Sequence, residues 1–502
     1  MQIKYRTIHL LSLCWLSISV MIFLLAWCHW YISTPITVAI CYTTYKFFKG
    51  LSSDNVLNIS KKNFILATIL ATIMMVLCGI GGYVVQSNDQ YYRNGMFCDI
   101  INYSWPIYDA KENLYLCYYF TLWLVPALFA KLFHSIEFGF LVQVVWISIG
   151  LILLFLEICV YIGKVKLGAL LIFYAFTGLK IIECLLYFPI FGGDTIRNTI
   201  LTLSTNGSPG VFHAGPIVQL LYDPFNQTIP LFLAMMLILN NRKSLFMGFI
   251  YSLVLYYAPF PFIGLAPIVL YIFLKNTHWE SIQSWAKSWF TPTNIIGLIL
   301  IILIGLFYTS NIQVSSNQGL RFSSNIIADI YSFALYIIFE VLVFVLIGYS
   351  ICTDKIMLLV SVLSVCIFGW FQIGGHNDFC FRSNMPLIFL LCLLTIKKYY
   401  NNNTSHHIKK MIVCILLIGG IPAQIHPLLR LISTGCIITN TDQSILNKHQ
   451  SFYDVTQMYV MQQKTMRNLD FGSAFGKGKE FEWSVSSVKA SPDSFFFKYL
   501  AR

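Results

Sequence analysis

Three polar segments, separated by long apolar stretches, carry the residue types of this chain that could do chemistry. A carboxylate at the edge of a nonpolar region can serve as a general base, because partial shielding from water raises its pKa. An arginine can hold a phosphate through two parallel hydrogen bonds, and a histidine or a further carboxylate can orient hydroxyl groups. The candidates are Asp89, Arg93 and Asp99 in the first segment, Asp194, Arg197, His213 and Asp223 in the second, and His376, Asp378 and Arg382 in the third.

Each candidate also has an ordinary structural interpretation. An Asp just past an apolar helix is commonly a solvated helix end, an Arg there can extend its head group to the lipid surface, and a lone His is more often a packing residue than a ligand. Three such segments on one face favour a shared polar site over three coincidences. Asp89 and Arg93 are four residues apart, so a surface helix would present both on one side.

The elements that must position these residues are membrane helices. Hydrophobic residues make up 57% of the 502 residues, charged residues only 11%, and the mean hydropathy is +0.70. Apolar runs of about 20 residues recur along the chain, and nearly all backbone inside a bilayer must be helical. A transmembrane barrel would show alternation instead. The net charge of +12 is divided among short Lys/Arg clusters between apolar runs, which indicates topology and not a nucleic-acid-binding surface.

These runs predict an all-α, polytopic transmembrane bundle of about thirteen spans, with the N-terminus and the Lys/Arg clusters in the cytoplasm. Pro259, Pro261 and Pro267 interrupt a run too long for one helix, so that run is expected to form a hairpin. The spans are predicted near 8–28, 33–48, 64–85, 137–161, 167–190, 214–240, 244–274 (two spans), 293–310, 329–351, 355–373, 385–397 and 411–427.

Two segments are predicted to lie outside the membrane, on the extracytoplasmic side. Residues 86–136 form a long loop, in which the apolar stretch 114–133 is expected to be re-entrant or to lie along the interface, because a span there would reverse every later Lys/Arg cluster. Residues 428–502 form a small C-terminal segment that we expect to fold against the outer face. The chain thus divides into a transmembrane domain, 1–427, and this C-terminal segment.

Four ionisable residues fall inside predicted spans: Glu157, Lys180, Glu183 and Glu340. Lys180 and Glu183 are spaced to pair on one helix face, and burying either one alone would cost several kcal/mol. We expect a neutralised structural pair. In a transporter the same residues would form a relay.

Three stretches of the sequence carry a resemblance to known proteins: GIGGYVVQSNDQYYRNGMFCDIINYSWPIYD, which begins at Gly79, YYFTLWLVPALFAKLF and GGHNDFCFRSNMP. Together with the topology of residues 1–427, and with a carboxylate in a long first external loop, they resemble the GT-C superfamily of integral membrane glycosyltransferases. The resemblance implies transfer of a sugar from a polyprenyl-phosphate donor to an extracytoplasmic glycan or lipid acceptor, at the bilayer of a bacterial inner membrane.

The resemblance also implies roles for the candidate residues. Asp89 would be the general base, and Arg382, with Arg93 or Arg197, would hold the phosphate. No Asp-Asp or Glu-x-Asp pair begins the loop, so a divalent cation is left open as a cofactor and no metal ligand is assigned. The residues that would bind sugar or acceptor groups are Asp99, Asp194, His213, Asp223, His376 and Asp378.

Three other functions remain open at this point. A polysaccharide polymerase or ligase would use the same carrier but more external arginines than Arg93, Arg197, Arg321 and Arg382. A secondary transporter would show two similar halves, and no internal repeat is visible in the sequence. A non-catalytic assembly protein would not need the clustered carboxylates.

Overall fold

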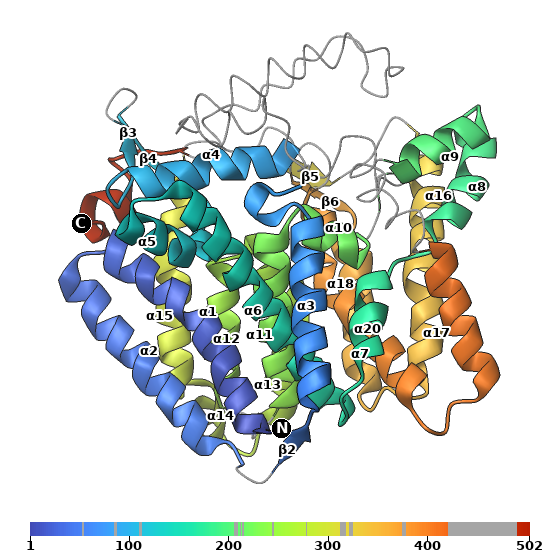
Figure 1. The fold of residues 1–502 in the computed structure, drawn as a ribbon, viewed down its shortest axis with the longest axis horizontal. Helices are drawn as coiled ribbons and strands as arrows, with labels where there is room; N and C mark the ends of the chain where they lie inside the picture. The colour runs from blue at the N-terminus through green and yellow to red at the C-terminus, as the bar shows by residue number, and fades with distance from the viewer. Residues whose placement is uncertain are drawn as a thin grey trace.

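The structure is a computed structural model, and it describes residues 1–52, 55–84, 88–109, 113–204, 209–210, 212, 215–242, 245–277, 279–311, 318–320, 325–373, 378–419 and 489–502. This part of the chain is mostly helical, as predicted. Long helices form a bundle, and short helices and strands lie across one of its ends (Figure 1).

The described residues contain seven helical segments that are long and apolar enough to cross a membrane: Tyr5–Trp27, Ile136–Ile162, Leu167–Phe191, Pro259–Asn276, Pro292–Thr309, Ile326–Tyr349 and Asp378–Tyr400. Shorter apolar helices occur at Thr121–Phe133, Phe225–Asn240 and Lys355–Phe368. These helices indicate an integral membrane protein, whereas the number of thirteen spans stays a prediction.

The first half of the bundle surrounds α11 (Phe225–Asn240), which is buried along its whole length from Phe225 to Leu239. α11 packs most extensively on α6 and α12 and also contacts α1. The other helices of this half are α1 (Tyr5–Trp27), α2 (Trp30–Gly50), α3 (Lys61–Leu77), α6 (Ile136–Ile162), α12 (Met247–Leu255) and α15 (Pro292–Thr309).

The second half of the bundle is joined to the first through α20 (Met385–Tyr400), which contacts α11 and is buried from Met385 to Ile396. Its other elements are α7 (Leu167–Ala175), α8 (Lys180–Phe191), α9 (Thr195–Ser204), α10 (Ile217–Tyr222), α13 (Pro259–Asn276), α16 (Ile326–Tyr336), the π-helical turn η3 (Ile337–Leu342), α17 (Val343–Tyr349), α18 (Lys355–Phe368), α19 (Asp378–Ser383) and helical residues 406–419.

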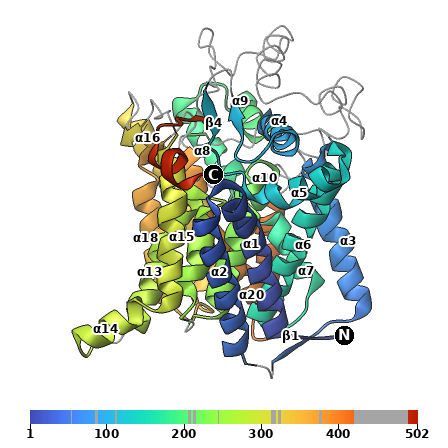
Figure 2. The ribbon, with the colours of Figure 1, turned by 90° about the vertical axis from the view of Figure 1, so that its left-hand side faces the viewer.

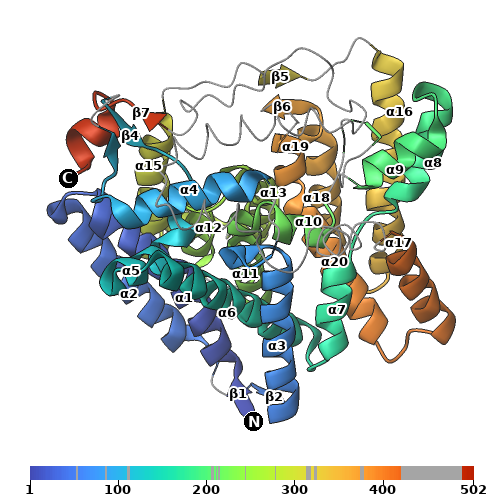
Figure 3. The ribbon, with the colours of Figure 1, turned by 45° about the horizontal axis from the view of Figure 1, so that its top comes forward.

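The layer across the bundle end contains α4 (Asn88–Asn102), whose axis lies across the long helices (Figures 1 and 3). The antiparallel strands β3 (Tyr108–Asp109), β4 (Leu114–Leu116) and β7 (Lys489–Ala490) form one small sheet there, with Tyr115 opposite both Tyr108 and Ala490. The C-terminal residues therefore pack on the loop 86–136. The remaining elements of this layer are η1 (Ile80–Gly82), η2 (Thr121–Trp123), α5 (Leu124–Phe133), the strand pair β5 (Gln318–Leu320) and β6 (Phe371–Ile373), and η5 (Phe496–Leu500).

The opposite end of the bundle carries the N-terminus, where β1 (Gln2–Lys4) pairs with β2 (Val56–Asn58) (Figure 2). The short helix α14 (Ile282–Trp289) projects from this end. α1, α3, α7 and α18 begin here and α2, α6, α13 and α20 end here, so the Lys/Arg clusters at these helix ends share one side of the molecule.

Several predicted helix boundaries are wrong for identifiable physical reasons. The predicted span 167–190 is confirmed as one apolar segment, Leu167–Phe191, but its helix is interrupted at residues 176–179, where Gly178 packs so closely on the Glu340 side chain that a Cβ would overlap it. The predicted helix 214–240 is interrupted at Asp223-Pro224, because proline disfavours helix at the preceding residue and lacks an N–H donor.

Two further predicted helices end early. α3 stops at Leu77, because Gly79 and Gly81 adopt left-handed backbone angles, φ +82° and +84°, that end a helix and that only glycine adopts readily. α18 stops at Phe368, and residues 371–373, which we expected in the same helix, form β6 instead. The stretch 114–133 contains β4, η2 and α5, and the apolar helix 121–133 is about 20 Å long, which is short of the roughly 30 Å hydrocarbon core.

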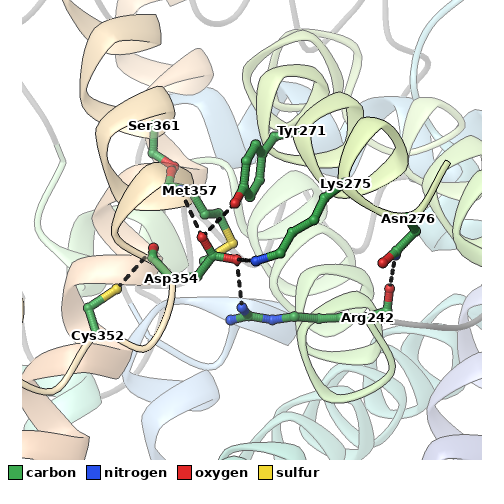
Figure 4. A network of polar contacts seen from close by, with 8 residues as sticks. All are labelled: Arg242, Tyr271, Lys275, Asn276, Cys352, Asp354, Met357 and Ser361. Atoms are coloured by element: carbon green, nitrogen blue, oxygen red, sulfur yellow. Dashed lines mark hydrogen bonds and ion pairs between the residues drawn. The ribbon is translucent and has the colours of Figure 1, made fainter. Parts of the chain in front are cut away.

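Asp354 connects three elements at the N-terminal end of the bundle (Figure 4). Its Oδ2 accepts from Lys275 Nζ at 2.7 Å and lies 3.5 Å from Arg242 Nη1, and its Oδ1 accepts from Tyr271 Oη at 2.7 Å. Oδ1 also accepts from the Met357 backbone N–H, so Asp354 is the N-cap of α18. One carboxylate thus fastens α13 and the end of α11 to the start of α18.

Asp354→Ala is expected to destabilise the protein by about 2 kcal/mol, because it removes an N-cap and charge-assisted hydrogen bonds at once. Burial by itself would raise the pKa of Asp354, but the hydrogen bonds from Lys275, Tyr271 and the Met357 N–H outweigh it and hold the pKa below its usual 3.8. The stabilisation that the Asp354 carboxylate supplies is therefore present at neutral pH, and it is lost as the pH falls through that depressed pKa, below about 4.

Thermal unfolding of the detergent-solubilised chain at pH 7 and pH 3 checks this expectation. Glu280→Ala, which removes an exposed carboxylate near the same end, is the matched control. Equal midpoints for the Asp354 and Glu280 variants at pH 7 would show that the network does not stabilise the fold.

Candidate functional site

Side chains in the first two turns of α4 fasten this helix across the bundle end. Gln90 Nε2 donates to the carbonyl oxygens of Cys78 at 2.7 Å and Tyr222 at 2.6 Å. Arg93 Nη1 donates to the carbonyl oxygen of Asp223, and the Arg93 side chain is buried. The turn between α10 and α11 is therefore held against α4, and the first and second polar segments of the sequence meet there.

Arg382 connects the third polar segment to the same region. It lies in α19, is only 8% exposed, and forms an ion pair with Asp378, one helical turn earlier, at 3.1 Å. Its Nη1 donates to Tyr119 Oη at 3.0 Å. Because Tyr119 belongs to the loop 86–136, Arg382 contacts the segment that also contains α4.

Tyr118 and Tyr119 are neighbours of Arg382. Their rings stack with centroids 3.8 Å apart. Burial raises the pKa of Tyr118 well above its ordinary value, and Tyr119 raises it further, whereas the positive charges of Arg93 and Arg382 act in the opposite direction. Both guanidinium groups are thus within electrostatic reach of one phenol, although they come from helices far apart in the sequence.

Such an arrangement suits an anion. Arg93 and Arg382 stand beside Asp223 and Asp378, and an arginine keeps its charge even when it is buried. Guanidinium groups bind phosphate oxygens through paired, charge-assisted hydrogen bonds. A stacked pair of phenol rings beside them adds two hydroxyl groups and an apolar face.

Close backbone packing fixes the position of α19. Gly215 lies against the ring of Phe381, the residue before Arg382, and Gly264 of α13 lies against the Ser383 carbonyl, where a Cβ would overlap it. His213 itself lies outside the described residues, but Gly215, two residues later, contacts α19.

Two predicted site residues lie elsewhere. Asp194 and Arg197 are exposed at the start of α9, where Asp194 Oδ1 accepts from the Arg197 backbone N–H at 3.1 Å. α8 packs on α16, and Figure 1 places α8 and α9 at the far side of the molecule from α4. A site shared by these two residues and Arg382 stays a prediction, because the contacts of Arg382 described above involve Asp378 and Tyr119.

The other predicted site residues fall into two groups. Asp99 is buried in α4, and Asp223 ends α10 next to Arg93. Asp89 lies in the first turn of α4, but its side chain is outside what the structure describes, as are His213 and His376.

Sequence reasoning missed Gln90, Tyr118 and Tyr119 as site residues. Tyrosines near membrane ends are common as interface anchors, so neither tyrosine of the pair was assigned a role. Two signals were available: the pair begins the stretch YYFTLWLVPALFAKLF, which carries the resemblance, and it lies in the same external loop as Asp89 and Arg93.

Ionisable residues predicted inside spans form a buried cluster of Lys180, Glu183 and Glu340. Glu183 interacts with Glu340 and with Lys180. The predicted pair on α8 is thus extended by a third residue from the π-helical turn η3. Tyr336 lies one helical turn before Glu340. Its Oη accepts a hydrogen bond at 2.8 Å from Nδ2 of Asn384, the residue just after α19.

Glu157 belongs to a second buried group. Its carboxylate oxygens lie 2.9 and 3.0 Å from His9 Nδ1, and Oε2 accepts from Asn240 Nδ2 at 2.8 Å. These contacts join α1, α6 and α11 near the N-terminal end of the bundle.

Comparison with family models, curated proteins and solved structures finds no match for this chain. In the part of the chain that the structure describes, no group of three or more His, Cys, Asp or Glu side chains is arranged to hold a metal ion. The class established at this point is an integral membrane protein with a helical bundle and, at one end, a polar centre that contains two arginines and two tyrosines.

Proposed function

We propose that this protein is a glycosyltransferase that moves a sugar from a polyprenyl-phosphate donor to a glycan or lipid acceptor on the extracytoplasmic side of a bacterial inner membrane. The observation that carries the proposal is the hydrogen bond from Arg382 to Tyr119, which stacks on Tyr118, a phenol that the charge of Arg93 also reaches. A lipid-linked phosphate needs positive charge at the edge of the bilayer, and these residues supply it there.

The chemistry assigns each group a part. The arginines neutralise charge that develops on the leaving phosphate, and the tyrosine rings suit the apolar face of a sugar. The acceptor hydroxyl needs a base, for which Asp89 on α4 is the candidate. A divalent cation stays open as a cofactor, and it would offset the charge of the donor phosphate.

The orientation follows from the positive-inside rule. The Lys/Arg clusters collect at the N-terminal end of the bundle, which we assign to the cytoplasm. α4, α19 and the C-terminal residues 489–502 lie at the other end, which we assign to the extracytoplasmic side (Figures 1 and 3). The full count of about thirteen spans and the extracytoplasmic assignment of 428–502 belong to this proposal.

The direct test is incubation of the purified protein with radiolabelled polyprenyl-phosphate sugars and candidate acceptors, with and without a chelator. We expect time-dependent transfer of label to one acceptor class. Binding of the donor without transfer to any acceptor, or no binding, would contradict the proposal.

Asp89→Asn is expected to lower the transfer rate at least 100-fold while leaving donor binding near normal, because a general base contributes about two to four orders of magnitude. The matched control is Asp194→Asn, which changes an exposed carboxylate on the far side of the molecule and should leave the rate unchanged. Rate constants and donor affinity measured for both variants check this. Normal turnover of Asp89→Asn would remove Asp89 from the mechanism.

A membrane transporter is the second candidate, favoured by Lys180, Glu183 and Glu340 beside the interruption between α7 and α8. Protonatable groups next to a broken helix are typical of transporter sites. Proton uptake into proteoliposomes that depends on Glu340 would favour the transporter, and label transfer without proton movement would favour the enzyme. A polymerase or ligase would be recognised by transfer of a preassembled oligosaccharide.

A further inference from the structure

A basic cavity of about 500 Å³ lies where three separate segments meet, at the end of the bundle opposite α4. It is lined by Lys164 and Lys166 from the turn between α6 and α7, Tyr399, Tyr400 and Asn402 at the end of α20, and Lys409 from the helical residues 406–419. The cavity contains none of the polar-site residues described above.

The charged residues that line the cavity are all positive. Three of its six residues are lysines, and the described residues that line it include no carboxylate. Lys164 is held in place, since its Nζ donates to the Tyr400 carbonyl at 2.6 Å and to Asn402 Oδ1 at 3.3 Å. Three ammonium groups around one hollow repel each other, so an anion in the hollow relieves that repulsion.

The start of α7 adds to this positive potential. α7 begins at Leu167, directly after Lys166, and the N-terminal end of a helix carries a partial positive charge. Gly168 leaves room for the Tyr400 hydroxyl, which a Cβ at this position would overlap. The hydroxyl therefore lies against the first turn of α7 and closes one side of the cavity.

The surroundings of the cavity are those of a membrane surface. Leu171, one turn further along α7, is 56% exposed, and Met411, next to the helical turn of Lys409, is 46% exposed. Tyr399 and Tyr400 are of the type found at the bilayer interface. An acyl chain could lie against these exposed apolar side chains while a charged head group occupies the cavity.

We propose that this cavity binds the phosphate group of an anionic phospholipid from the surrounding leaflet. Basic pockets between transmembrane helices on the cytoplasmic side are suited to such head groups. The ordinary alternative is that the lysines only set topology. It does not explain why lysines from two distant segments surround one cavity. The same phosphate chemistry could come from a soluble phosphate, which the experiment separates from the lipid.

The test is native mass spectrometry of the full chain in detergent, titrated with palmitoyl-oleoyl phosphatidylglycerol or with the phosphatidylcholine of the same chains. We expect phosphatidylglycerol to bind at least tenfold more tightly. Lys166→Gln with Lys409→Gln should weaken its binding about 30-fold, since each lysine near an anionic head group contributes about fivefold.

The control is Lys49→Gln with Lys287→Gln, which removes two exposed lysines at the same end but outside the cavity. This control should keep the affinity for phosphatidylglycerol. Equal weakening in both double variants, or equal affinity for the two lipids, would overturn the proposal. Displacement of the bound lipid by millimolar inorganic phosphate would overturn the lipid as occupant and assign the cavity to a soluble phosphate.

Discussion

Arg382→Gln is expected to lower the second-order rate constant of sugar transfer by about 1,000-fold, if the proposed transferase reaction is correct. Arg382 is nearly buried and is oriented by Asp378 and Tyr119, so its position needs no adjustment when charge develops on the phosphate. Preorganised groups of this kind contribute about 4 kcal/mol to transition-state stabilisation, which corresponds to three orders of magnitude.

Arg382→Lys tests the charge of the side chain separately from its planar shape. Lysine keeps the positive charge but lacks the planar fork that contacts Tyr119 and Asp378 together. We expect the rate constant of Arg382→Lys to lie between those of the wild type and Arg382→Gln. The loss should fall chiefly on the rate at saturating donor. Steady-state kinetics with varied donor concentration measure both quantities.

Arg197→Gln is the matched control, because Arg197 was an equal candidate from the sequence and lies exposed on α9. Its rate constants should stay within about twofold of the wild type. If Arg197→Gln lost activity while Arg382→Gln kept it, the phosphate site would have to lie near α9, and the polar centre at Tyr118 and Tyr119 would need another role.

The features that could be predicted from the sequence follow from local patterns. The apolar runs predict α1, α2, α6 and α15 within a few residues, because a run of about 20 apolar residues is sufficient to define a membrane helix. The spacing of Asp89 and Arg93 predicts a surface helix, and α4 is helical there. The spacing of Lys180 and Glu183 predicts a pair on one face of α8.

The features that could not be predicted depend on partners without a sequence signal. Arg93 donates to the carbonyl of Asp223, and every residue type offers a carbonyl, so no pattern distinguishes this one. Glu340 joins Glu183 from a helix far away in the chain. β4 and β7 contain three residues or fewer, which is too short for a visible alternation.

Helix packing also explains why the structure brings only some of the predicted site residues together. Arg93 contacts Asp223 because α4 is held against the turn between α10 and α11, and Arg382 contacts Tyr119 in the same loop as α4. Asp194 and Arg197 had equal chemical merit, but they lie exposed at the start of α9, which follows α8, and α8 packs on α16. Residue type identified which side chains could do the chemistry, and packing decided which of them do lie together.

His9→Phe is expected to destabilise the protein by about 3 kcal/mol, without any direct effect on the polar centre. Glu157 is fully buried, and its carboxylate contacts the His9 ring at 2.9 and 3.0 Å and Asn240 at 2.8 Å. Removing one partner of a buried pair leaves the other group buried without the partner that offset its loss of water. This typically lowers the stability of the fold by 3–5 kcal/mol. The remaining hydrogen bond from Asn240 places the expected loss at the lower end of that range.

The double variant His9→Phe with Glu157→Leu distinguishes this explanation from simple loss of packing. Replacing a whole buried pair with apolar residues is often neutral or stabilising, so the double variant should unfold at a higher temperature than His9→Phe alone. Thermal unfolding in one detergent, with the two single variants measured beside it, gives the coupling energy between the two sites. Additive losses would mean that His9 and Glu157 stabilise the junction of α1, α6 and α11 independently, through their volume and not through their contact.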